Sequence, residues 1–418
     1  MKRAVWTKQA LFAATLWGGL AWTVLMGCGR PGPRSVSDLS SSAGDALKDA
    51  ANSIPTGDGT APVKTVAAGP TKAPPAGTGP TPAPAAVNPG TKPEATGEKP
   101  KPPAVDYSRL PLFEGWPAPQ AAIVITGEMD GYIEPCGCAG KENQKGGVSR
   151  RLTFLKGLRD QGWGVVPVDL GGQIKRFGRQ TEVKFHRVVE ALREMKYAAI
   201  GLGYRDCSLP AEDLLSEAGE ADGPFVSSNV GVFDASIPSR FKIIEQNGLK
   251  IGVASVLGDE YAKQLNNSDL VLTPAAEALA PIVKELKAKA DFLVLLSHAP
   301  RDESLALAKK FPDFNVVVTA GGADEPPFEP KQLDGSKTLL IEVGHKGMYA
   351  SVIGVYADAK QPWRYQRVPL DARFAESDSM VALMRSYQEQ LETVGLEGLG
   401  VKPLPHPSGR TFIGSQAC

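Results

Sequence analysis

Seven apolar runs of strand length recur along the middle of the chain. They are AAIVIT (121–126), WGVVPVDL (163–170), AAIGLG (198–203), KIGVASVL (250–257), DFLVLLSH (291–298), NVVVTA (315–320) and TLLIEV (338–343). Three longer segments carry apolar residues at three- and four-residue spacing, which predicts amphipathic helices: SRRLTFLKGLRDQG (149–162), EVKFHRVVEALREMK (182–196) and PAAEALAPIVKELKAKA (274–290). Strands that are apolar almost throughout and alternate with helices are typical of sheets buried on both faces, so the pattern predicts an α/β domain.

The pattern changes after residue 337. The stretches TLLIEVGHKGMYASVIGVYAD (338–358) and WRYQRVPL (363–370) predict closely spaced strands in an antiparallel meander. A final helix is predicted at about 376–394. We therefore place the globular domain at 106–375, which is long enough to bury a sizeable core, and a C-terminal helix and tail at 376–418.

The first 28 residues predict export from the cytoplasm. Three basic residues precede an apolar stretch from Ala10 to Met26, which ends in small residues before Cys28, and this order is typical of a secretory signal. The phrase LMGC (25–28) resembles the lipobox of bacterial lipoproteins, in which cleavage leaves the cysteine, here Cys28, as the diacylated first residue. The alternative is an uncleaved signal anchor with an incidental cysteine. We favour a periplasmic or surface-exposed envelope lipoprotein, and Gly29, which is not the Asp associated with inner-membrane retention, favours the outer membrane.

Residues 29–105 consist mostly of Pro, Ala, Gly, Thr and Ser. Because such a segment has too few apolar side chains to compensate for its ordering entropy, it is predicted to be a disordered linker. A flexible coil of this length spans roughly 50 Å.

Charge and composition bear on the class of partner. The chain has 46 basic and 46 acidic residues, so its formal net charge is zero. The sequence shows neither a basic stripe with interleaved aromatic residues nor a glycine-rich phosphate loop after a strand. These features argue against a nucleic-acid partner.

Eight phrases, in order, resemble the calcineurin-like metallophosphoesterases and bacterial 5′-nucleotidases. They are VITGEMDG, GGVSRRLTFLK, VVPVDLGG, AAIGLGYRD, VSSNV, LLSHAP, VVVTAGGADE and IEVGHKGMYASVIGVY, spread over about 120–357. The resemblance implies a four-layer α/β sandwich of two mixed sheets flanked by helices, preceded here by the disordered linker. It also implies a dinuclear metal site at the carboxyl ends of the central strands, which activates a water and clamps a phosphoryl group.

The first two ligand phrases of that family are altered in this chain. The family has Asp-x-His after the first strand, whereas this chain has Glu128 and Asp130. After the second strand, Gly172 stands where the resemblance implies the bridging Asp, and Asp169 lies close by.

The later ligand phrases are altered as well. Tyr204 and Arg205 replace the implied Asn and catalytic His, and Arg205 is a permanent cation that opposes metal binding. Asp324, beside Ala323, occupies the neighbourhood of the implied His pair, while His298 is the one ligand retained in kind. The chain has four histidines, and two of them, His186 and His406, lie outside the motif positions.

Two interpretations of the cleft remain open. In one, a subset of Glu128, Asp130, Asp169, Asp206, His298 and Asp324 binds a single divalent cation such as Mn, Zn or Ca. In the other, which we favour, hydrolysis has been lost and Arg205 forms an internal salt-bridge network with Asp130 and Asp206, in a cleft also lined by Tyr204 and Asn229.

The loop YIEPCGCAGKENQKGG (132–147) places Cys136 and Cys138 on the rim of the implied site, and Cys207 should approach the same rim. Outside the cytoplasm such cysteines are usually oxidised. Three alternatives follow: a disulfide, most readily between Cys207 and Cys136 or Cys138; a soft-metal site; or a reactive thiol. Gly146 and Gly147 fit a tight turn into the following helix.

The last residues, TFIGSQAC, resemble the phrase before the first haem-binding cysteine of multihaem cytochrome c domains. A c-type haem needs Cys-x-x-Cys-His, and this sequence ends at Cys418, so no haem is expected in it. Either the sequence is a truncated fusion or Cys418 is an incidental terminal thiol.

Our leading hypothesis is an envelope lipoprotein, tethered to the membrane by lipid, with a degenerate metallophosphoesterase-like domain. That domain would have a binding or accessory role near an envelope redox system, with envelope cytochromes or a small phosphorylated ligand as partners. The alternatives are an active metal-dependent hydrolase of phosphate esters or nucleotides, and a soft-metal or thiol-redox protein.

Overall fold

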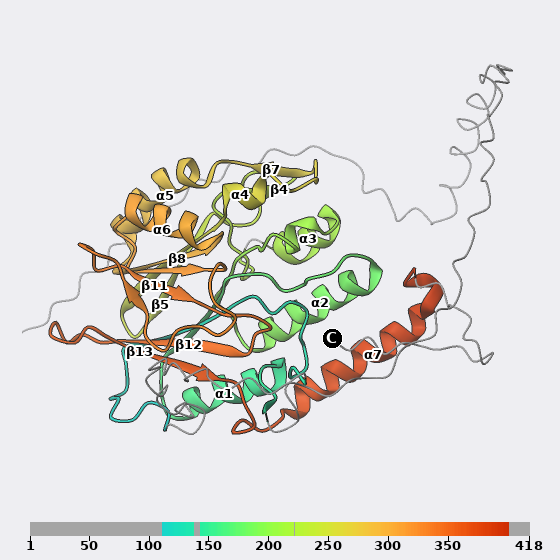
Figure 1. Ribbon diagram of the computed structural model, residues 1–418, viewed down its shortest axis with the longest axis horizontal. Helices are drawn as coiled ribbons and strands as arrows, with labels where there is room; N and C mark the ends of the chain where they lie inside the picture. The colour runs from blue at the N-terminus through green and yellow to red at the C-terminus, as the bar shows by residue number, and fades with distance from the viewer. Residues whose placement is uncertain (1–110, 138–142, 221, 401–418) are drawn as a thin grey trace, which may run out of the picture. The chain divides into compact units, whose positions relative to one another are not determined.

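The computed structural model describes residues 111–137, 143–220 and 222–400. The signal segment with Cys28, the linker 29–105, Cys138 and Cys418 lie outside these ranges. Two large sheets form the centre of the domain, and helices cover their outer faces (Figure 1).

The first sheet has five strands in the order β13-β12-β1-β2-β3. Their bounds are β1 Ala121–Thr126, β2 Val165–Asp169, β3 Ala199–Ile200, β12 Tyr349–Val355 and β13 Trp363–Pro369. The β1, β2 and β3 strands are parallel, whereas β12 is antiparallel to both β1 and β13. The sheet is therefore mixed.

The second sheet has six strands in the order β10-β11-β9-β8-β6-β5. Their bounds are β5 Phe241–Gln246, β6 Leu249–Leu257, β8 Phe292–His298, β9 Val316–Thr319, β10 Lys331–Gln332 and β11 Leu339–Glu342. A small separate pair joins β4 (Val230–Val232) to β7 (Leu270–Leu272). The seven apolar runs of the sequence correspond to β1, β2, β3, β6, β8, β9 and β11.

Alternation along β1 explains the layering. Ala121, Ile123 and Ile125 point into the core between the two sheets, and Ala122 and Val124 point into the core beneath the helices. All five are completely buried, and each fully buried Val or Ile side chain contributes about 1.5–3 kcal/mol of transfer free energy. A strand that supplies two cores has to be apolar on both faces, which is why its sequence shows no polar alternation.

Helices complete the four layers. The outer face of the five-stranded sheet packs on α1 (Val148–Asp160), α2 (Arg179–Glu194), α3 (Ala211–Ala218) and α7 (Asp378–Gly398). The outer face of the six-stranded sheet packs on α5 (Ala275–Lys289) and α6 (Arg301–Lys310). Two short elements, η3 (Asp206–Ser208) and α4 (Asp259–Ala262), lie in connections.

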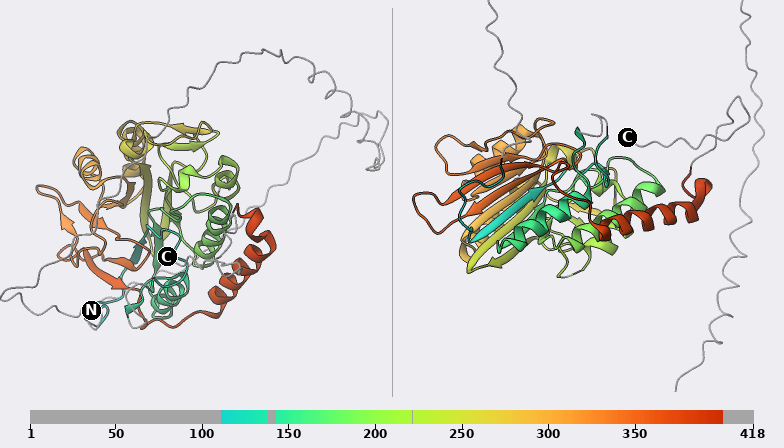
Figure 2. Two further views of the ribbon diagram at one scale, coloured as in Figure 1. Left: turned by 45° about the vertical axis from the view of Figure 1, so that its right-hand side comes forward. Right: turned by 90° about the horizontal axis from the view of Figure 1, so that it is seen from below.

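The C-terminal helix packs on the globular core. In both views of Figure 2, α7 runs beside α1, and its Met380, Leu383 and Tyr387 are buried in the same core as α1 and α2. Compact packing therefore continues past residue 375. Within the described ranges, we find no helix with the length and apolar character needed to cross a bilayer.

The predicted antiparallel meander is wrong at its first strand. β11 pairs in parallel with β9 in the six-stranded sheet, and the chain then crosses to the five-stranded sheet, where β12 and β13 form an antiparallel pair. The crossing lies at 343–348, where Gly344 and Gly347 adopt positive φ angles of 72° and 57°. Spacing along the sequence could not show this change of sheet. His345 lies in this connection between the two sheets' strands β11 and β12.

Candidate functional site

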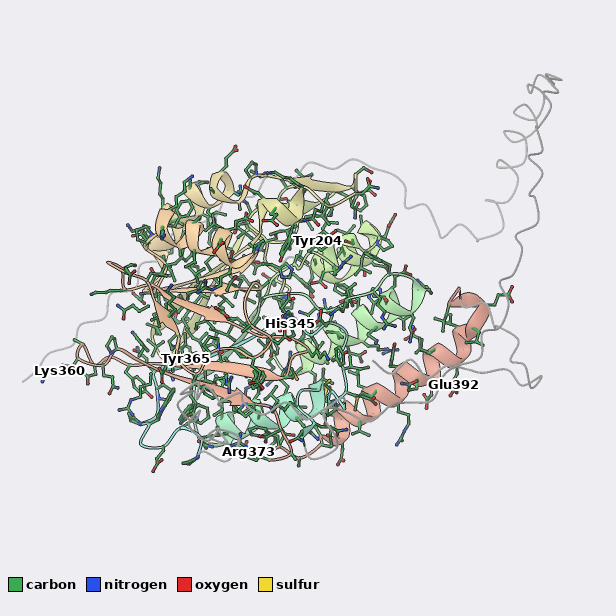
Figure 3. The ribbon with its side chains drawn as sticks, viewed as in Figure 1. Tyr204, His345, Lys360, Tyr365, Arg373 and Glu392 are labelled. Atoms are coloured by element: carbon green, nitrogen blue, oxygen red, sulfur yellow. The ribbon has the colours of Figure 1, made fainter. Side chains whose placement is uncertain are left out.

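The candidate site lies where the carboxyl ends of the parallel strands of both sheets meet. Loops after β1, β2, β3, β8 and β11 converge there, and Figure 3 shows His345 and Tyr204 near the middle of the molecule. The loop after β1 has unusual backbone geometry, with φ of 48° at Glu128 and 54° at Asp130. Non-glycine residues in this region are strained, and such strain concentrates at functional sites.

Glu128 and His298 form the centre of the site. The Glu128 Oε1 and His298 Nδ1 atoms are 3.1 Å apart, and both side chains are largely buried. Neither atom has a well-aligned hydrogen-bond partner. Burial lowers the pKa of His298, but the Glu128, Asp206 and Asp130 carboxylates outweigh it and raise that pKa above its ordinary value. The pair is therefore best described as a close ion pair.

Asp206 fastens the loops after β2 and β3 to one another. Its Oδ2 accepts backbone N–H bonds from Gly172 (2.8 Å) and Gly203 (2.9 Å), and its Oδ1 accepts from Gln173 (2.9 Å) and Ile174 (3.3 Å). Burial raises the pKa of Asp206 to about 6, against the opposing effect of these N–H groups and of His298. The carboxylate acts as an anchor of the loop backbone.

Asp169 is fully buried and its carboxylate is bonded by neighbouring protein groups. Its Oδ1 accepts from Gly171 N (2.9 Å) and Gln173 Nε2 (2.6 Å), and its Oδ2 accepts from Thr126 Oγ1 (2.5 Å). The guanidinium of Arg151 lies 3.5 Å from Oδ2, and both side chains are fully buried. Both carboxylate oxygens therefore already have protein partners, whereas the sequence suggested Asp169 as a tentative metal ligand.

Asp130 and Asp324 gather around His345. Asp130 Oδ2 lies 3.4 Å from Lys175 Nζ and 3.9 Å from His345 Nδ1, and Asp324 Oδ1 lies 3.3 Å from His345 Nε2. Burial and the Glu128 carboxylate raise the pKa of Asp130, while Lys175 and His345 lower it in part. The Asp324 carboxylate is almost fully exposed.

Sequence reasoning missed His345 and Lys175 as parts of this site. His345 stands in the phrase IEVGHKG, which served only as evidence for the fold. Its position in a loop between two predicted strands could have indicated a place in the site. Lys175 follows the DLGG phrase by three residues and carries no motif of its own.

Comparisons of the sequence with known proteins find relatives among the metallophosphoesterases and 5′-nucleotidases. No protein-family model matches the chain. In sequence, it is 27% identical over 159 residues to the uncharacterized metallophosphoesterase YunD of Bacillus subtilis, covering 36% of this chain and 34% of YunD. It is 24% identical over 282 residues to human 5′-nucleotidase, covering 62% of this chain and 48% of that protein. The chain thus spans between a third and a half of the length of these curated relatives.

Solved structures show the same fold. The 5′-nucleotidase precursor of Thermus thermophilus superposes with a TM-score of 0.55 at 17% identity, covering 66% of this chain and 59% of that one. The calcineurin-like phosphoesterase YfkN of Bacillus subtilis gives 0.51 at 16% identity, covering 65% and 97%. The sulfate thiohydrolase SoxB of Thermus thermophilus gives 0.56 at 13% identity, covering 66% and 62%.

The globular part of the chain is similar in sequence to a metallophosphoesterase and a 5′-nucleotidase and has the fold of the 5′-nucleotidases. The predicted family resemblance and the predicted fold of two mixed sheets flanked by helices are confirmed.

A cluster of aromatic rings adjoins His298 in this metallophosphoesterase-like domain. The Tyr261 ring lies 5.7 Å from the His298 ring and 5.7 Å from the Tyr204 ring, centroid to centroid. The Arg205 guanidinium lies 5.0 Å from the Tyr204 ring and 5.1 Å from the ring of Phe177, which is 63% exposed. Tyr261 and Phe177 had no signal in the sequence beyond their aromatic character.

The predicted internal salt-bridge network of Arg205 with Asp130 and Asp206 is wrong. Arg205 stacks on aromatic rings at the rim, Asp206 is saturated by backbone N–H groups, and Asp130 pairs with Lys175. The physical reason is the direction of the η3 turn, which buries Asp206 and leaves Arg205 half-exposed.

Asn229, which the sequence placed in the cleft, has a backbone-bracing role. Its Nδ2 donates to the carbonyls of Leu257 (2.8 Å) and Thr273 (3.1 Å), and its Oδ1 accepts from Leu257 N (2.9 Å). All its polar atoms are engaged, so it holds the end of β6 in place.

Cys207 does not lie at the predicted rim. Cys207 is fully buried in the core beneath the helices, and burial together with Asp206 raises the pKa of its thiol. Cys136 and Cys207 are not bonded to one another, so that one of the predicted pairings is wrong, whereas the pairing of Cys207 with Cys138 stays a prediction. The Sγ of Cys136 accepts a 3.6 Å contact from Lys346 Nζ, and Cys138 is not among the described residues.

Proposed function

We propose that this domain is a binding module in which the dinuclear centre of the metallophosphoesterases has been dismantled. The observation that supports this most is at Gly172, the position of the implied bridging Asp. A Cβ atom placed on Gly172 would lie 2.3 Å from Glu128 Oε1. The Glu128 carboxylate therefore fills the space that a side chain at Gly172 would need.

The remaining donors do not fit two metal ions. A two-metal site needs a bridging ligand and several further donors directed at one small volume. Here Asp206 is engaged by four backbone N–H groups, and Asp169 by three donors and Arg151. Across residues 111–137, 143–220 and 222–400, no three His, Cys, Asp or Glu side chains are grouped to hold a metal ion.

Protein cations compensate the carboxylates of the cleft. His298 faces Glu128, Lys175 faces Asp130, and Arg151 faces Asp169. Buried carboxylates need such partners, because an unpaired buried charge is costly. Three carboxylates of the site therefore have a protein cation beside them where the resemblance implies metal ions.

The test is metal content and hydrolysis measured on the full chain purified from the envelope. After exposure to Mn²⁺, Zn²⁺ and Ca²⁺, elemental analysis should find no stoichiometric metal that depends on Glu128, Asp130 or His298. Hydrolysis of bis(p-nitrophenyl) phosphate and of AMP should equal that of the Glu128→Gln and His298→Gln variants. Two equivalents of a metal that both variants lose, with turnover, would overturn the proposal.

A second candidate, a hydrolase with a rebuilt single-metal site, has one observation in its favour. Glu128 Oε1 and His298 Nδ1 are buried, lack aligned hydrogen-bond partners and lie 3.1 Å apart. Two adjacent ligands of one octahedral ion bound at about 2.1 Å are separated by about 3 Å. This candidate predicts one equivalent of metal, lost in either variant, and turnover that disappears with it.

We also propose that the domain is held at the outer membrane by a lipid on Cys28, with a redox system of the envelope as its neighbour. The signal, lipobox and linker sequences support the anchor, and the segment ending at Cys418 supports the neighbour. Radiolabelled palmitate should be incorporated into the full chain and lost in Cys28→Ser. Equal labelling of both chains would contradict lipidation at Cys28.

A further inference from the structure

Arg205 is a cation of the candidate site that has no carboxylate partner. Three carboxylates of the site each have a protein cation within 3.5 Å: Glu128 with His298, Asp130 with Lys175, and Asp169 with Arg151. Among residues 111–137, 143–220 and 222–400, no carboxylate lies within salt-bridge distance of Arg205, and no acceptor takes a hydrogen bond from its guanidinium. The half-exposed guanidinium can therefore donate to an acceptor from outside the chain.

The backbone that carries Arg205 is fixed from beneath. Arg205 directly precedes the η3 turn, and the buried carboxylate of Asp206 accepts from the backbone N–H groups of Gly203 (2.9 Å) and Ile174 (3.3 Å). Ile174 leads into the exposed loop that holds Phe177. One carboxylate thus holds both the turn with Arg205 and the loop with Phe177, so the two side chains are positioned before a ligand arrives.

Two aromatic rings restrain the Arg205 side chain. Its guanidinium carbon lies 5.0 Å from the centre of the Tyr204 ring and 5.1 Å from that of the Phe177 ring. Contacts of this kind restrict a long side chain and leave its N–H groups available to an acceptor. Arg364 and Arg367 also contact rings, but both donate to backbone carbonyl oxygens. Arg205 is restrained as they are, and its donors are not used by the described part of the chain.

The charges around Arg205 favour a ligand group with a single negative charge. The Asp206 carboxylate follows it directly in the chain, and Lys175, two residues before Phe177, already faces Asp130 at 3.4 Å. A phosphate monoester carries about two negative charges at neutral pH and would need a second uncommitted cation. A carboxylate carries one charge, and its two oxygens match the planar fork of one guanidinium.

Phe177 indicates what adjoins the carboxylate of the ligand. Its side chain is 63% exposed, the highest fraction among the large apolar side chains that the structure describes. An aromatic ring placed on the exposed surface of Phe177 would remove apolar area from water beside the charged contact. Arg205 and Phe177 therefore offer, side by side, accessible N–H donors and accessible aromatic surface.

We infer that Arg205 and Phe177 bind a carboxylate that is joined to an aromatic group. The inference rests on the proposed binding function and names the chemical class of its ligand. A free aromatic acid and the C-terminal aromatic residue of a peptide share this chemistry. A neutral ligand fits less well, because it would leave the Arg205 charge without a counter-charge.

The experiment is a fluorine NMR titration of the full chain, in EDTA, with para-fluorophenylacetate as the probe. We expect saturable binding below about 10 mM, as one charge-assisted contact allows. Arg205→Gln should weaken binding about tenfold or more, and Arg205→Lys nearly as much, because an ammonium lacks the planar fork. Phe177→Ala should weaken it about threefold or more. Each variant changes a side chain at the rim, so the midpoint of urea unfolding should stay near that of the parent.

Arg364→Lys is the matched control, because Arg364 also contacts a ring but already donates to the chain, so this change should leave the affinity unchanged. Phenylacetamide and phenyl phosphate are the matched ligands, and both should compete less well than phenylacetate. N-acetylphenylalanine distinguishes the two sources of the carboxylate. Competition stronger than that of phenylacetate favours a peptide end, weaker competition favours a free acid, and both results keep the inference.

Three results would overturn the inference. They are absence of saturable binding up to about 10 mM, equal competition by the amide or the phosphate ester, and unchanged affinity in Arg205→Gln. The titration contains no metal and measures no turnover. Its failure therefore leaves the metal and hydrolysis tests of the proposed function unaffected, and a positive result in those tests would overturn the proposed function alone.

Discussion

Glu128 and His298 connect the two sheets at the carboxyl ends of β1 and β8. Glu128 follows β1 of the five-stranded sheet and His298 ends β8 of the six-stranded sheet, and 3.1 Å separates Glu128 Oε1 from His298 Nδ1. An ion pair thus joins the two sheets directly. The pair thus gives the cleft a structural function that does not depend on metal.

The space taken by Glu128 can be measured by substitution at Gly172. Gly172 has φ of 78° and a Cβ there would meet Glu128 Oε1 at 2.3 Å, so Gly172→Ala combines backbone strain with a clash. We expect it to lower the free energy of unfolding by about 2 kcal/mol or more, measured by urea titration. Gly162→Ala is the control, because Gly162 has φ of 81° and open space around it.

Combining Gly172→Ala with Glu128→Ala should restore part of the loss, with a coupling energy of about 1 kcal/mol between neighbouring residues. The Gly162 variant should show no coupling to Glu128→Ala. If Gly172→Ala and Gly162→Ala lower the free energy of unfolding equally, the Glu128 side chain moves aside at no energetic cost. In that case it does not fill the space beside Gly172.

The Arg151–Asp169 pair should be costly to break. Both side chains are fully buried, and the three guanidinium nitrogens have no well-aligned hydrogen-bond partner. Arg151→Met leaves the Asp169 carboxylate without its cation, and we expect a loss of about 3 kcal/mol in the free energy of unfolding. Lys156→Met on the same helix breaks the exposed Lys156–Asp160 pair and should cost about 0.5 kcal/mol or less. A loss for Arg151→Met as small as this would contradict the buried-pair assignment.

Much of the fold could be predicted from the sequence, because strands buried on both faces are recognisable as continuous apolar runs. The β1 run and the α2 spacing are local signals, and both elements lie where the pattern put them. The switch of the chain between sheets after β11 is a tertiary event, so a meander looked equally consistent.

The candidate site was less predictable, because the direction in which each side chain points determines which residues belong to the site. Glu128, Asp130 and His298 were identified by their place after strands, and they do meet. Arg205 and Cys207 flank Asp206 in a single turn, yet Arg205 turns to the rim and Cys207 into the core. Residue type and spacing carry no information on which way such a turn faces.

Burial of Cys207 should protect its thiol from alkylation. Its side chain is fully buried and burial raises its pKa, so the reactive thiolate is scarce and inaccessible. In the native full chain, iodoacetamide should label Cys136 before Cys207, and both should react in concentrated guanidinium, as peptide mass spectrometry would show. Cys207→Ala should cost about 1 kcal/mol through lost packing. Equal native labelling rates at the two positions would place Cys207 at the surface instead.

His186 joins α2 to α3 through a contact that needs a protonated ring. Its Nδ1 lies 2.7 Å from Glu217 Oε1 and its Nε2 lies 3.1 Å from Asp213 Oδ1. Because a neutral imidazole has one N–H, only the cation donates to both carboxylates. The hydrogen bond to Glu217 raises the pKa of His186 most, burial opposes it, and Asp213 adds to the rise, while Arg193 also engages Glu217.

A histidine whose pKa is higher in the folded chain stabilises the fold fully below its unfolded pKa of about 6.5, and that stabilisation disappears as pH rises through the folded value. His186→Gln should therefore lower the free energy of unfolding more at about pH 5.5 than at about pH 9. We expect a difference of about 1 kcal/mol or less, because the ring is about a third exposed and solvent screens the pair. Glu190→Gln, an exposed change on the same helix, should shift stability equally at both pH values. If the loss caused by His186→Gln does not depend on pH, the pKa of His186 is the same in the folded and unfolded chains, and the contact with the two carboxylates does not stabilise the protonated ring.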